Sequence, residues 1–306
     1  MKALITGIDG FVGPYLAIHL KSLGYTTVGT YLVGSGIDES SRHMDITNKQ
    51  EVLDIISEEK PDYIYHLAGF SSVAASFSNP EKCMDINVNG TKNLLDSVKS
   101  VGIKPRFFVV SSAEVYGVPD YLPLNEKHPL TPQSPYAESR VEQERLCIKY
   151  AKKYGFHIVI SRSFNHTGPG QSDAFVLSSF AKQISDIEKG LQQTLKVGNL
   201  DAVRDFSDVR DVVIAYQLLM EKGKSREIYN VCSGKYHSIK ELLNMLVALS
   251  THEINIEVDP ARKRPSDIPV LYGDNKQCIK QTGWQIKISI EKTLSDLLEY
   301  WRAKLY

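Results

Sequence analysis

ALITGIDGFVGPYL, residues 3–16, places three glycines directly after a short apolar run and at the start of an amphipathic segment. Gly7 allows a tight turn, Gly10 lets the backbone approach a pyrophosphate, and Gly13 lets the following helix pack closely on a strand. The first N–H groups of that helix would face the anion. An ordinary turn between a strand and a helix is the alternative, but the strand-turn-helix context favours a dinucleotide-binding turn.

On the C-terminal side of this turn, short β-branched or aromatic runs alternate with longer amphipathic segments. Such alternation predicts a parallel sheet with helices on both faces, that is, an α/β fold with a Rossmann-type doubly wound sheet. The expected strands are ALIT (3–6), TTVGTYL (26–32), YIYHLA (63–68), RFFVVSS (106–112) and HIVISRS (157–163), and the expected helices span about 11–23, 49–59, 81–101 and 135–154.

The alternation ends after Ser163, where glycine, proline and asparagine punctuate the sequence. We expect residues 1–165 to form the dinucleotide-binding domain and residues 166–306 mainly a smaller C-terminal substrate-binding lobe. Further helices are expected near 174–189 and 208–222. The helix near 208–222 and a strand near 227–232 are expected to return to the first domain.

Composition limits the classes of partner. The 306 residues contain 36 Lys+Arg and 36 Asp+Glu, so neither nucleic acid nor a membrane surface is an expected partner, and small molecules are. No apolar stretch approaches the length of a membrane span, and the start MKALITGIDG lacks a signal-peptide core, so we expect a cytoplasmic protein. The spacing of Cys83, Cys147, Cys232 and Cys278 indicates neither a metal site nor a disulfide framework.

The end of the second predicted strand bears on the choice of dinucleotide. Sites that prefer NAD usually place an acidic residue there to hold the ribose diol, whereas this strand ends in Thr30 and Tyr31. The missing carboxylate favours NADP(H), and NAD(H) stays the alternative. Asp45, in HMDIT, is either an adenine contact together with Ile46 or part of a helix cap before Thr47.

Six motifs resemble those of the extended short-chain dehydrogenase/reductases that act on nucleotide sugars. They occur in that family's order and spacing, and the resemblance covers essentially the whole chain. Other segments resemble the branch that holds GDP-4-keto-6-deoxy-mannose reductases and GDP-mannose 4,6-dehydratases. The six motifs are TGIDGFVG, HLAG, NVNGT, VVSSAEVYG, SPYAESR and RSFNHTGPGQ, and the segments of the branch are FNHTGPGQ, FAKQI, KVGNLDAVRDFSDVRD, YNVCSG and RPSDIP.

The resemblance implies a catalytic set. Tyr136 would give or take the proton at the sugar C4 oxygen, and Ser112 would hydrogen-bond the same oxygen. Glu114 is compatible with proton removal in a dehydratase and with the pattern of the reductases, so it does not decide between them. The length of the chain favours a reductase, because the dehydratases tend to be longer.

Arg140 departs from the family pattern, in which lysine holds the nicotinamide ribose and lowers the tyrosine pKa. Arginine keeps the charge but is larger and more diffuse. Moving a unit charge from about 5 to about 7 Å at an effective dielectric near 20 loses about 1 kcal/mol, which predicts a slowed enzyme or one that holds its cofactor tightly. The alternative is that Arg140 is a surface helix residue and the chemistry has been lost.

The resemblance also implies the residues that hold the two ligands. No metal is expected. The cofactor-binding residues would be Gly7, Asp9, Gly10, Phe11, Val12, Gly13, Thr30, Tyr31, Asp45, Ile46, Leu67, Ala68, Gly69, Asn87, Tyr136, Arg140 and Phe164. The substrate-binding residues would be Ser112, Glu114, Asn165, Lys182, Val197, Arg204, Arg264 and Asp267.

These implications predict NADPH-dependent C4-keto reduction of a GDP-4-keto-6-deoxy-hexose, giving GDP-D-rhamnose, or reduction of a close heptose analogue. The alternatives are a GDP-mannose-type 4,6-dehydratase with catalytic bound NADP⁺ and a GDP-sugar 4-dehydrogenase or epimerase. A dinucleotide-binding sensor or scaffold is the alternative outside enzymes. Relatives also suggest a homodimer that pairs the helices after HLAG and around SPYAESR in a four-helix bundle.

Overall fold

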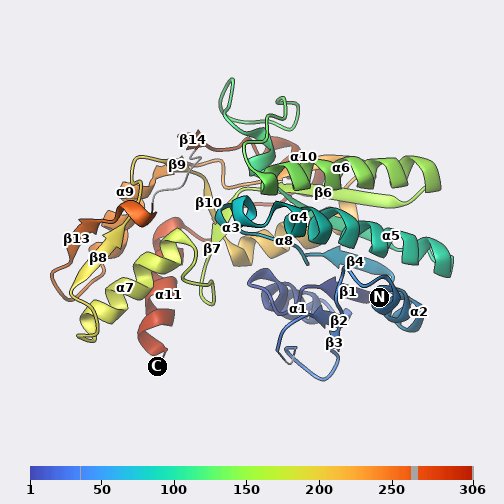
Figure 1. Ribbon diagram of the computed structural model, residues 1–306, viewed down its shortest axis with the longest axis horizontal. Coiled ribbons are helices and arrows are strands. Elements are labelled where there is room, and N and C mark those ends of the chain that lie inside the picture. Colours follow the sequence, from blue (N-terminus) through green and yellow to red (C-terminus); the bar gives the residue numbers. More distant parts are fainter. Residues whose placement is uncertain (35, 263–267, 305–306) are drawn as a thin grey trace.

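A seven-stranded sheet forms the centre of the computed structural model, which describes residues 1–34, 36–262 and 268–304 (Figure 1). The strand order is β11-β6-β5-β4-β1-β2-β3, and all neighbours are parallel. This confirms the predicted doubly wound sheet. Its strands are β1 (Lys2–Thr6), β2 (Thr26–Tyr31), β3 (Arg42–His43), β4 (Tyr63–His66), β5 (Arg106–Ser112), β6 (His157–Ser163) and β11 (Ile228–Val231).

Helices cover both faces of this sheet, each over its own apolar core. Each core forms because the helix turns its apolar stripe toward strands that are buried on both sides. One face carries α1 (Val12–Ser22), α8 (Val209–Lys222) and α10 (Lys276–Thr282). The other carries α2 (Lys49–Glu59), α5 (Gly90–Val101) and α6 (Pro135–Tyr154).

The segment expected to be one helix over 81–101 is broken into several turns. Short helices α3 (Val73–Ser78) and α4 (Pro80–Met84) precede a π-helical turn, η1 (Asp85–Asn89), and only then does α5 begin. Proline fits the first turn of a new helix, and a π turn inserts one extra residue into the helical ladder. The Asn87 amide is buried and bonds both backbone groups of Phe70, which accounts for the irregular turn.

The remaining elements form a smaller unit around a third apolar core, which lies at one side of the sheet in Figure 1. Trp301 is buried in this core, and its indole N–H donates to Ser178. The unit comprises α7 (Val176–Glu188), α9 (Ile239–Val247) and α11 (Ile290–Ala303), with β8 (Thr194–Val197) paired to β13 (Asn255–Val258). η3 (Pro260–Arg262) lies beside Gly198, directly after β8. The other elements are η2 (Ala113–Tyr116), β7 (Asn165–Thr167) paired to β10 (Phe206–Asp208), and β9 (Val203–Arg204) paired to β12 (His237–Ser238) and β14 (Val270–Leu271).

Candidate active site

The glycine turn lies between β1 and α1, at the carboxyl end of the sheet. Gly7 has a φ of +71°, and a Cβ there would lie 2.9 Å from the Ala68 backbone. A Cβ on Gly13 would lie 2.5 Å from the Ile8 carbonyl oxygen, so both positions exclude any side chain. No side chain caps the N-terminus of α1. Its first N–H groups therefore keep their capacity to bind an anion.

The residues around the glycines differ in exposure. Asp9 and Gly10 are exposed, whereas Phe11 and Val12 are half-buried. The ring of Phe11 stacks on that of His166, with centroids 6.1 Å apart. The start of α1 is thereby joined to β7, the strand that carries Asn165.

The second strand ends as the sequence indicates, without a carboxylate. Thr30 is buried, and Tyr31 packs edge-on against His43. Asp38, in the loop that follows, binds the Lys21 ammonium at 2.5 Å, and this contact lowers its pKa to about 2.

Asp45 makes a local turn rather than a helix cap. Its Oδ1 accepts the backbone N–H and the hydroxyl of Thr47, while Asn48 caps α2. Ile46 is buried against Gly90.

Ser112 closes β5, and its Oγ accepts the Glu114 N–H at 3.2 Å. That bond caps η2, the short helix that carries Glu114 and packs against α6. The end of β5 therefore places Glu114 on a short helix that packs against α6, the helix that carries Tyr136.

The stretch SPYAESR forms the first turns of α6 for clear local reasons. Ser134 caps the helix by accepting the Ala137 N–H at 3.1 Å, and Pro135 takes the first helical position. Tyr136 follows in this first turn and is only 7% exposed. A capped first turn holds a phenol in a defined place, as proton transfer requires.

Arg140 lies one turn farther along α6 and is only 5% exposed, so the alternative of a surface residue is wrong. Its guanidinium carbon lies 5.3 Å from the centroid of the Tyr136 ring. Nη1 donates to the Val110 carbonyl and the Gln143 amide oxygen, and Nη2 donates to the Phe70 carbonyl. Arg140 is thus buried within the candidate site, at the position where the family pattern has a lysine.

Two separate parts of this site suit a bound dinucleotide, namely the glycine turn with the start of α1 and the guanidinium of Arg140. The glycine turn leaves a cradle that a Cβ would fill, and the start of α1 has uncapped N–H groups. The Arg140 Nε is also buried and has no hydrogen-bond partner in the parts of the chain that the structure describes. Buried donors are normally paired, so this orphan suits a ligand hydroxyl.

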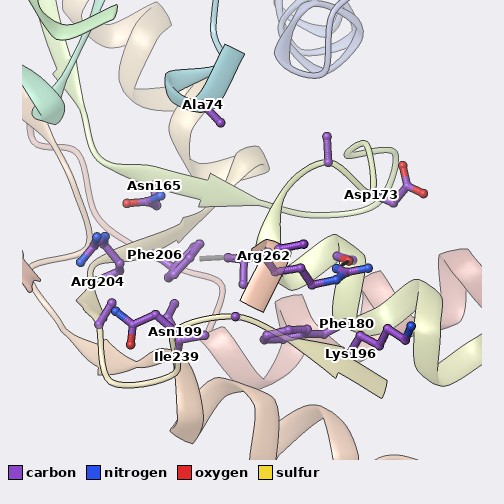
Figure 2. Close-up of a pocket in the computed structure, with 16 residues that line it drawn as sticks. Ala74, Asn165, Asp173, Phe180, Lys196, Asn199, Arg204, Phe206, Ile239 and Arg262 are labelled. Atoms are coloured by element: carbon purple, nitrogen blue, oxygen red, sulfur yellow. Dashed lines mark hydrogen bonds between the residues drawn. The ribbon is translucent and has the colours of Figure 1, made fainter. Parts of the chain in front are cut away.

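A cavity of about 460 Å³ opens between α3 and the smaller unit (Figure 2). Ala74 stands on the side of the sheet, while Phe180, Phe206 and Ile239 supply apolar surface from the other side. Three cationic residues also line it: Lys196, Arg204 and Arg262. Apolar walls with a few convergent cations suit a nucleoside diphosphate.

The predicted substrate residues divide into three groups. Asn165 and Arg204 line the cavity. Lys182 is not among its lining residues, and its ammonium pairs with Asp186 at 2.7 Å. Val197 is fully buried in the smaller core, although Lys196 and Gly198 on either side of it reach the cavity.

Two predicted residues, Arg264 and Asp267, lie outside the described residues. Arg262, two positions earlier, does line the cavity and donates to the Ser179 hydroxyl at 3.1 Å. The substrate residues expected from the sequence include Arg264 but not Arg262. Lys196 and Phe180 were also missed, and only a pattern of strand β8 and helix α7 facing one space could have indicated them.

Three other expectations concern absences and burial. The four cysteines are buried thiols. No cluster of His, Cys, Asp and Glu that could hold a metal ion occurs among the described residues. Within the same residues, no helix combines the length and the apolar character needed to cross a membrane.

Phe164, one of the residues expected to bind the cofactor, is buried beside Gly273 and Tyr116.

Comparison with known proteins places this chain among nucleotide-sugar enzymes. The sequence profile of the GDP-mannose 4,6 dehydratase family matches residues 4–297. A GDP-6-deoxy-D-mannose reductase of Pseudomonas aeruginosa is 35% identical, with 99% of this chain and 98% of the relative covered. A GDP-mannose 4,6-dehydratase of Vibrio cholerae is 28% identical, with 97% of this chain and 92% of the relative covered.

Solved structures agree with the sequence comparison. The structure described as RMD from Pseudomonas aeruginosa complexed with NADPH superposes with a TM-score of 0.90, is 34% identical and covers 99% of both chains. A Thermus thermophilus UDP-glucose 4-epimerase in complex with NAD also gives a TM-score of 0.90, at 25% identity and with full coverage of both chains.

Proposed function

The chain belongs to the GDP-mannose 4,6 dehydratase family, and on that premise we propose that it reduces GDP-4-dehydro-6-deoxy-D-mannose to GDP-D-rhamnose with NADPH. The observation that carries the proposal is the near-complete mutual coverage with a reductase of that sugar class at 35% identity. By contrast, the alignment with the Vibrio cholerae dehydratase extends over 344 positions, more than the 306 residues of this chain. The dehydratase therefore contains segments that this chain lacks.

The catalytic step follows from the residues at the end of β5 and the start of α6. NADPH, when bound, supplies a hydride to the C4 carbon. The C4 oxygen then needs a proton, which the Tyr136 hydroxyl donates, while Ser112 hydrogen-bonds the same oxygen and orients it. The Arg140 charge, 5.3 Å from the ring centroid of Tyr136, stabilises the phenolate left behind.

The cofactor side of the site supports NADP(H). The end of β2 carries no carboxylate to repel a 2′-phosphate. Of the two acids in the loop that follows, Asp38 is bound by Lys21 and Ser40, and Glu39 is exposed. Gly7, Gly10 and Gly13 would hold the pyrophosphate. Use of NAD(H) remains the second candidate, since a neighbouring epimerase binds it on the same fold.

The cavity of Figure 2 would take the GDP part of the substrate. Its cations, Lys196, Arg204 and Arg262, match the charge of a diphosphate, and Arg is well suited to phosphate oxygens. Asn165 lies at the end of the cavity toward β7 and would contact the sugar phosphate. A GDP-heptose analogue would fit the same cavity, because residues that bind the diphosphate do not distinguish one sugar from another.

Two other reactions remain as lesser candidates. A 4,6-dehydratase would use Glu114 to remove the C5 proton and would release a 4-keto product without added reductant. A 4-dehydrogenase or epimerase would use the same Tyr136. A sensor or scaffold would bind the dinucleotide without turnover and would be unaffected by Tyr136→Phe.

We further infer a cytoplasmic homodimer that pairs α5 and α6 with their copies. The exposed face of α6 is acidic near its start, at Glu138 and Glu142, and basic near its end, at Lys149 and Lys152. Two antiparallel copies would place opposite charges together, which is the complementarity that a two-fold interface needs. Sedimentation at low and high salt tests this, since a dimer held by these charges weakens as salt rises.

Purified protein with GDP-4-dehydro-6-deoxy-D-mannose and NADPH tests the reaction. We expect loss of the reduced-nicotinamide absorbance together with formation of GDP-D-rhamnose, identified by NMR. The Tyr136→Phe variant should lose about 10²- to 10⁴-fold in kcat while binding NADPH normally. A wild-type protein that binds NADPH but never consumes it with this sugar would overturn the assignment, and a 4-keto product formed from GDP-mannose would identify a dehydratase.

A further inference from the structure

Gly69 lies in the turn after β4, next to the guanidinium of Arg140. Its φ is outside the left-handed region, so its backbone does not require glycine. A Cβ at this position would nevertheless lie 2.8 Å from Arg140 Nη2 and 2.9 Å from Asn87 Oδ1. The missing side chain therefore serves to leave space, and the guanidinium fills most of it.

The hydrogen-bond acceptors around this space suit the planar, branched guanidinium group of an arginine. Arg140 Nη1 donates to Val110 O at 3.1 Å and to Gln143 Oε1 at 2.9 Å, and Nη2 donates to Phe70 O at 3.3 Å. A lysine has a single nitrogen on an unbranched stem and cannot meet three acceptors spread around a plane. Replacing Arg140 by lysine would take the arginine donor from Val110 O and Gln143 Oε1, whereas Phe70 O would keep the Asn87 amide.

Gln143 is in turn held by a chain of buried hydrogen bonds, in which the donor and the acceptor of each bond can be assigned consistently. Its Nε2 donates to Thr91 Oγ1 at 2.8 Å, and the Thr91 hydroxyl donates to the Asn87 carbonyl. Thr91 Oγ1 can then only accept from His66 Nε2, at 2.9 Å. His66 is therefore neutral with its proton on Nε2, and its Nδ1 accepts from Thr6 at 2.8 Å.

The chain of bonds reaches the glycine turn. Thr6, the last residue of β1, accepts the Ala68 N–H at 3.1 Å on the same hydroxyl oxygen that donates to His66. Ala68 is the residue against which Gly7 packs. Since Gln143 Oε1 faces the guanidinium and its Nε2 faces this chain, the amide of Gln143 cannot flip without losing both bonds.

We propose that Gly69 and Gln143 are positioning residues for the guanidinium of Arg140, so that Arg140 and Gly69 form a matched pair. The inference rests on the proposed function, because it assigns the guanidinium to the support of Tyr136 and of the cofactor. Gly69 gives the guanidinium its room, and Gln143 fixes its rotation. Replacing Arg140 by lysine alone would then lower the activity of the enzyme and not raise it.

A double-mutant cycle tests the pair, with Gly69→Ala made in the native protein and in the Arg140→Lys background. In the native protein Gly69→Ala should lower kcat/KM by about tenfold or more, because a displacement of about 1 Å at a catalytic group is costly. In the Arg140→Lys background the loss should be about threefold or less; part of it remains because Asn87 Oδ1 still contacts the new methyl group. An equal fold-change in both backgrounds would overturn the proposal.

A second test concerns Gln143 and compares the effect of one substitution on kcat in two backgrounds. Gln143→Met keeps the volume but releases the guanidinium, so kcat should fall by about tenfold in the native protein. The same change in the Arg140→Lys background should lower kcat by about threefold or less. Gln217→Met, at a buried glutamine on α8, is the control for loss of a buried amide and should leave kcat within about twofold. An equal fold-change for Gln143→Met in both backgrounds would refute the role of Gln143.

The same cycle is also read without any sugar, from the NADPH dissociation constant and the thermal midpoint of all four Gly69 and Arg140 proteins. Coupling in these two quantities without turnover would mean that the reaction is wrongly assigned but the matched pair is right. Turnover with strictly additive effects would mean that the reaction stands and the matched pair does not exist.

Discussion

Arg140 is the residue at which this chain departs from the pattern expected of the family, and the structure changes the expectation for this residue most. From the sequence, a larger and more diffuse cation predicts a handicap. In the structure the guanidinium is buried, points into the site and donates to three acceptors. Its guanidinium carbon lies 5.3 Å from the centroid of the Tyr136 ring.

This geometry predicts that Arg140→Lys destabilises the protein. Val110 O and Gln143 Oε1 would lose the Arg140 donor, whereas Phe70 O keeps the Asn87 amide, and each buried acceptor left unpaired costs about 1–3 kcal/mol. Part of this is recovered by one bond from the lysine, so we expect a loss of about 2 kcal/mol in the free energy of unfolding, measured with urea. Arg145→Lys, on the exposed face of the same helix, should change it by no more than about 0.5 kcal/mol. An unchanged midpoint for Arg140→Lys would contradict the three-acceptor geometry.

His66 gives a prediction for acid conditions. Burial, and then the Arg140 charge, lowers its pKa from 6.5 to about 3. Because the unfolded chain binds a proton below its pKa of 6.5 and the folded chain does not, the contribution of His66 is complete above that pH and falls as the pH drops toward 3. Between about pH 7 and pH 5 the free energy of unfolding should therefore decrease by about 2 kcal/mol through this group alone.

His66→Gln separates that contribution from the rest of the acid response. The variant is expected to be less stable at neutral pH, because two buried bonds change, but its stability should fall less steeply between about pH 7 and pH 5. Parallel curves for the two proteins would show that His66 does not stay neutral when folded.

At the scale of elements, the turn between β1 and α1 shows why the glycines are not interchangeable. Gly7 and Gly24 flank α1 and both have a positive φ, of +71° and +82°. A side chain at Gly7 would meet the Ala68 backbone, whereas nothing lies within 4 Å of a Cβ at Gly24. Strain is common to both positions, but only the first faces the predicted pyrophosphate.

We predict that Gly7→Ala abolishes measurable NADPH binding by fluorescence titration, since the turn must open to admit the methyl group and the cradle is lost. Gly24→Ala should lower the free energy of unfolding by about 1 kcal/mol through its positive φ and leave the NADPH dissociation constant within about twofold. Equal effects of the two variants on cofactor binding would argue against the glycine turn as the dinucleotide site.

At the scale of the whole molecule, the cavity exists only because two units of the chain face each other. Ala74 reaches it from the sheet side, and Phe180, Lys196 and Arg262 reach it from the smaller unit. In the proposed function, cofactor and sugar nucleotide would thus be held by different parts of the chain. Substitutions on the far wall should affect only one of the two ligands.

Arg262→Ala should raise the KM for the GDP-sugar by about 10- to 100-fold, as expected when a charge-assisted contact to a phosphate is removed. The NADPH dissociation constant should stay within about twofold, because Arg262 lies on η3, away from the glycine turn. Lys280→Ala, at an exposed position of α10, should change neither quantity. A KM unaffected by Arg262→Ala would remove this residue from the diphosphate site.

The sequence alone determined the doubly wound sheet and the glycine turn, whereas the expected catalytic motifs of β5 and α6 came from the resemblance to a family. These features depend on local periodicity, on turn glycines and on a helix cap such as Ser134, all of which are written in neighbouring residues. The interruption at Asn87 was not predictable, because its cause is a contact with Phe70, which is distant in sequence. Local patterns cannot report such a contact.

Only the tertiary structure decided what surrounds Arg140 and which residues line the cavity. The guanidinium is satisfied by groups from β5, from the turn after β4 and from α6, and the space it fills is left by Gly69. Likewise Arg262 reaches the cavity while Val197 points into the smaller core, a difference that depends on how α7, β8 and η3 pack together. Motifs name the chemical groups, but packing between distant segments sets their positions and therefore their roles.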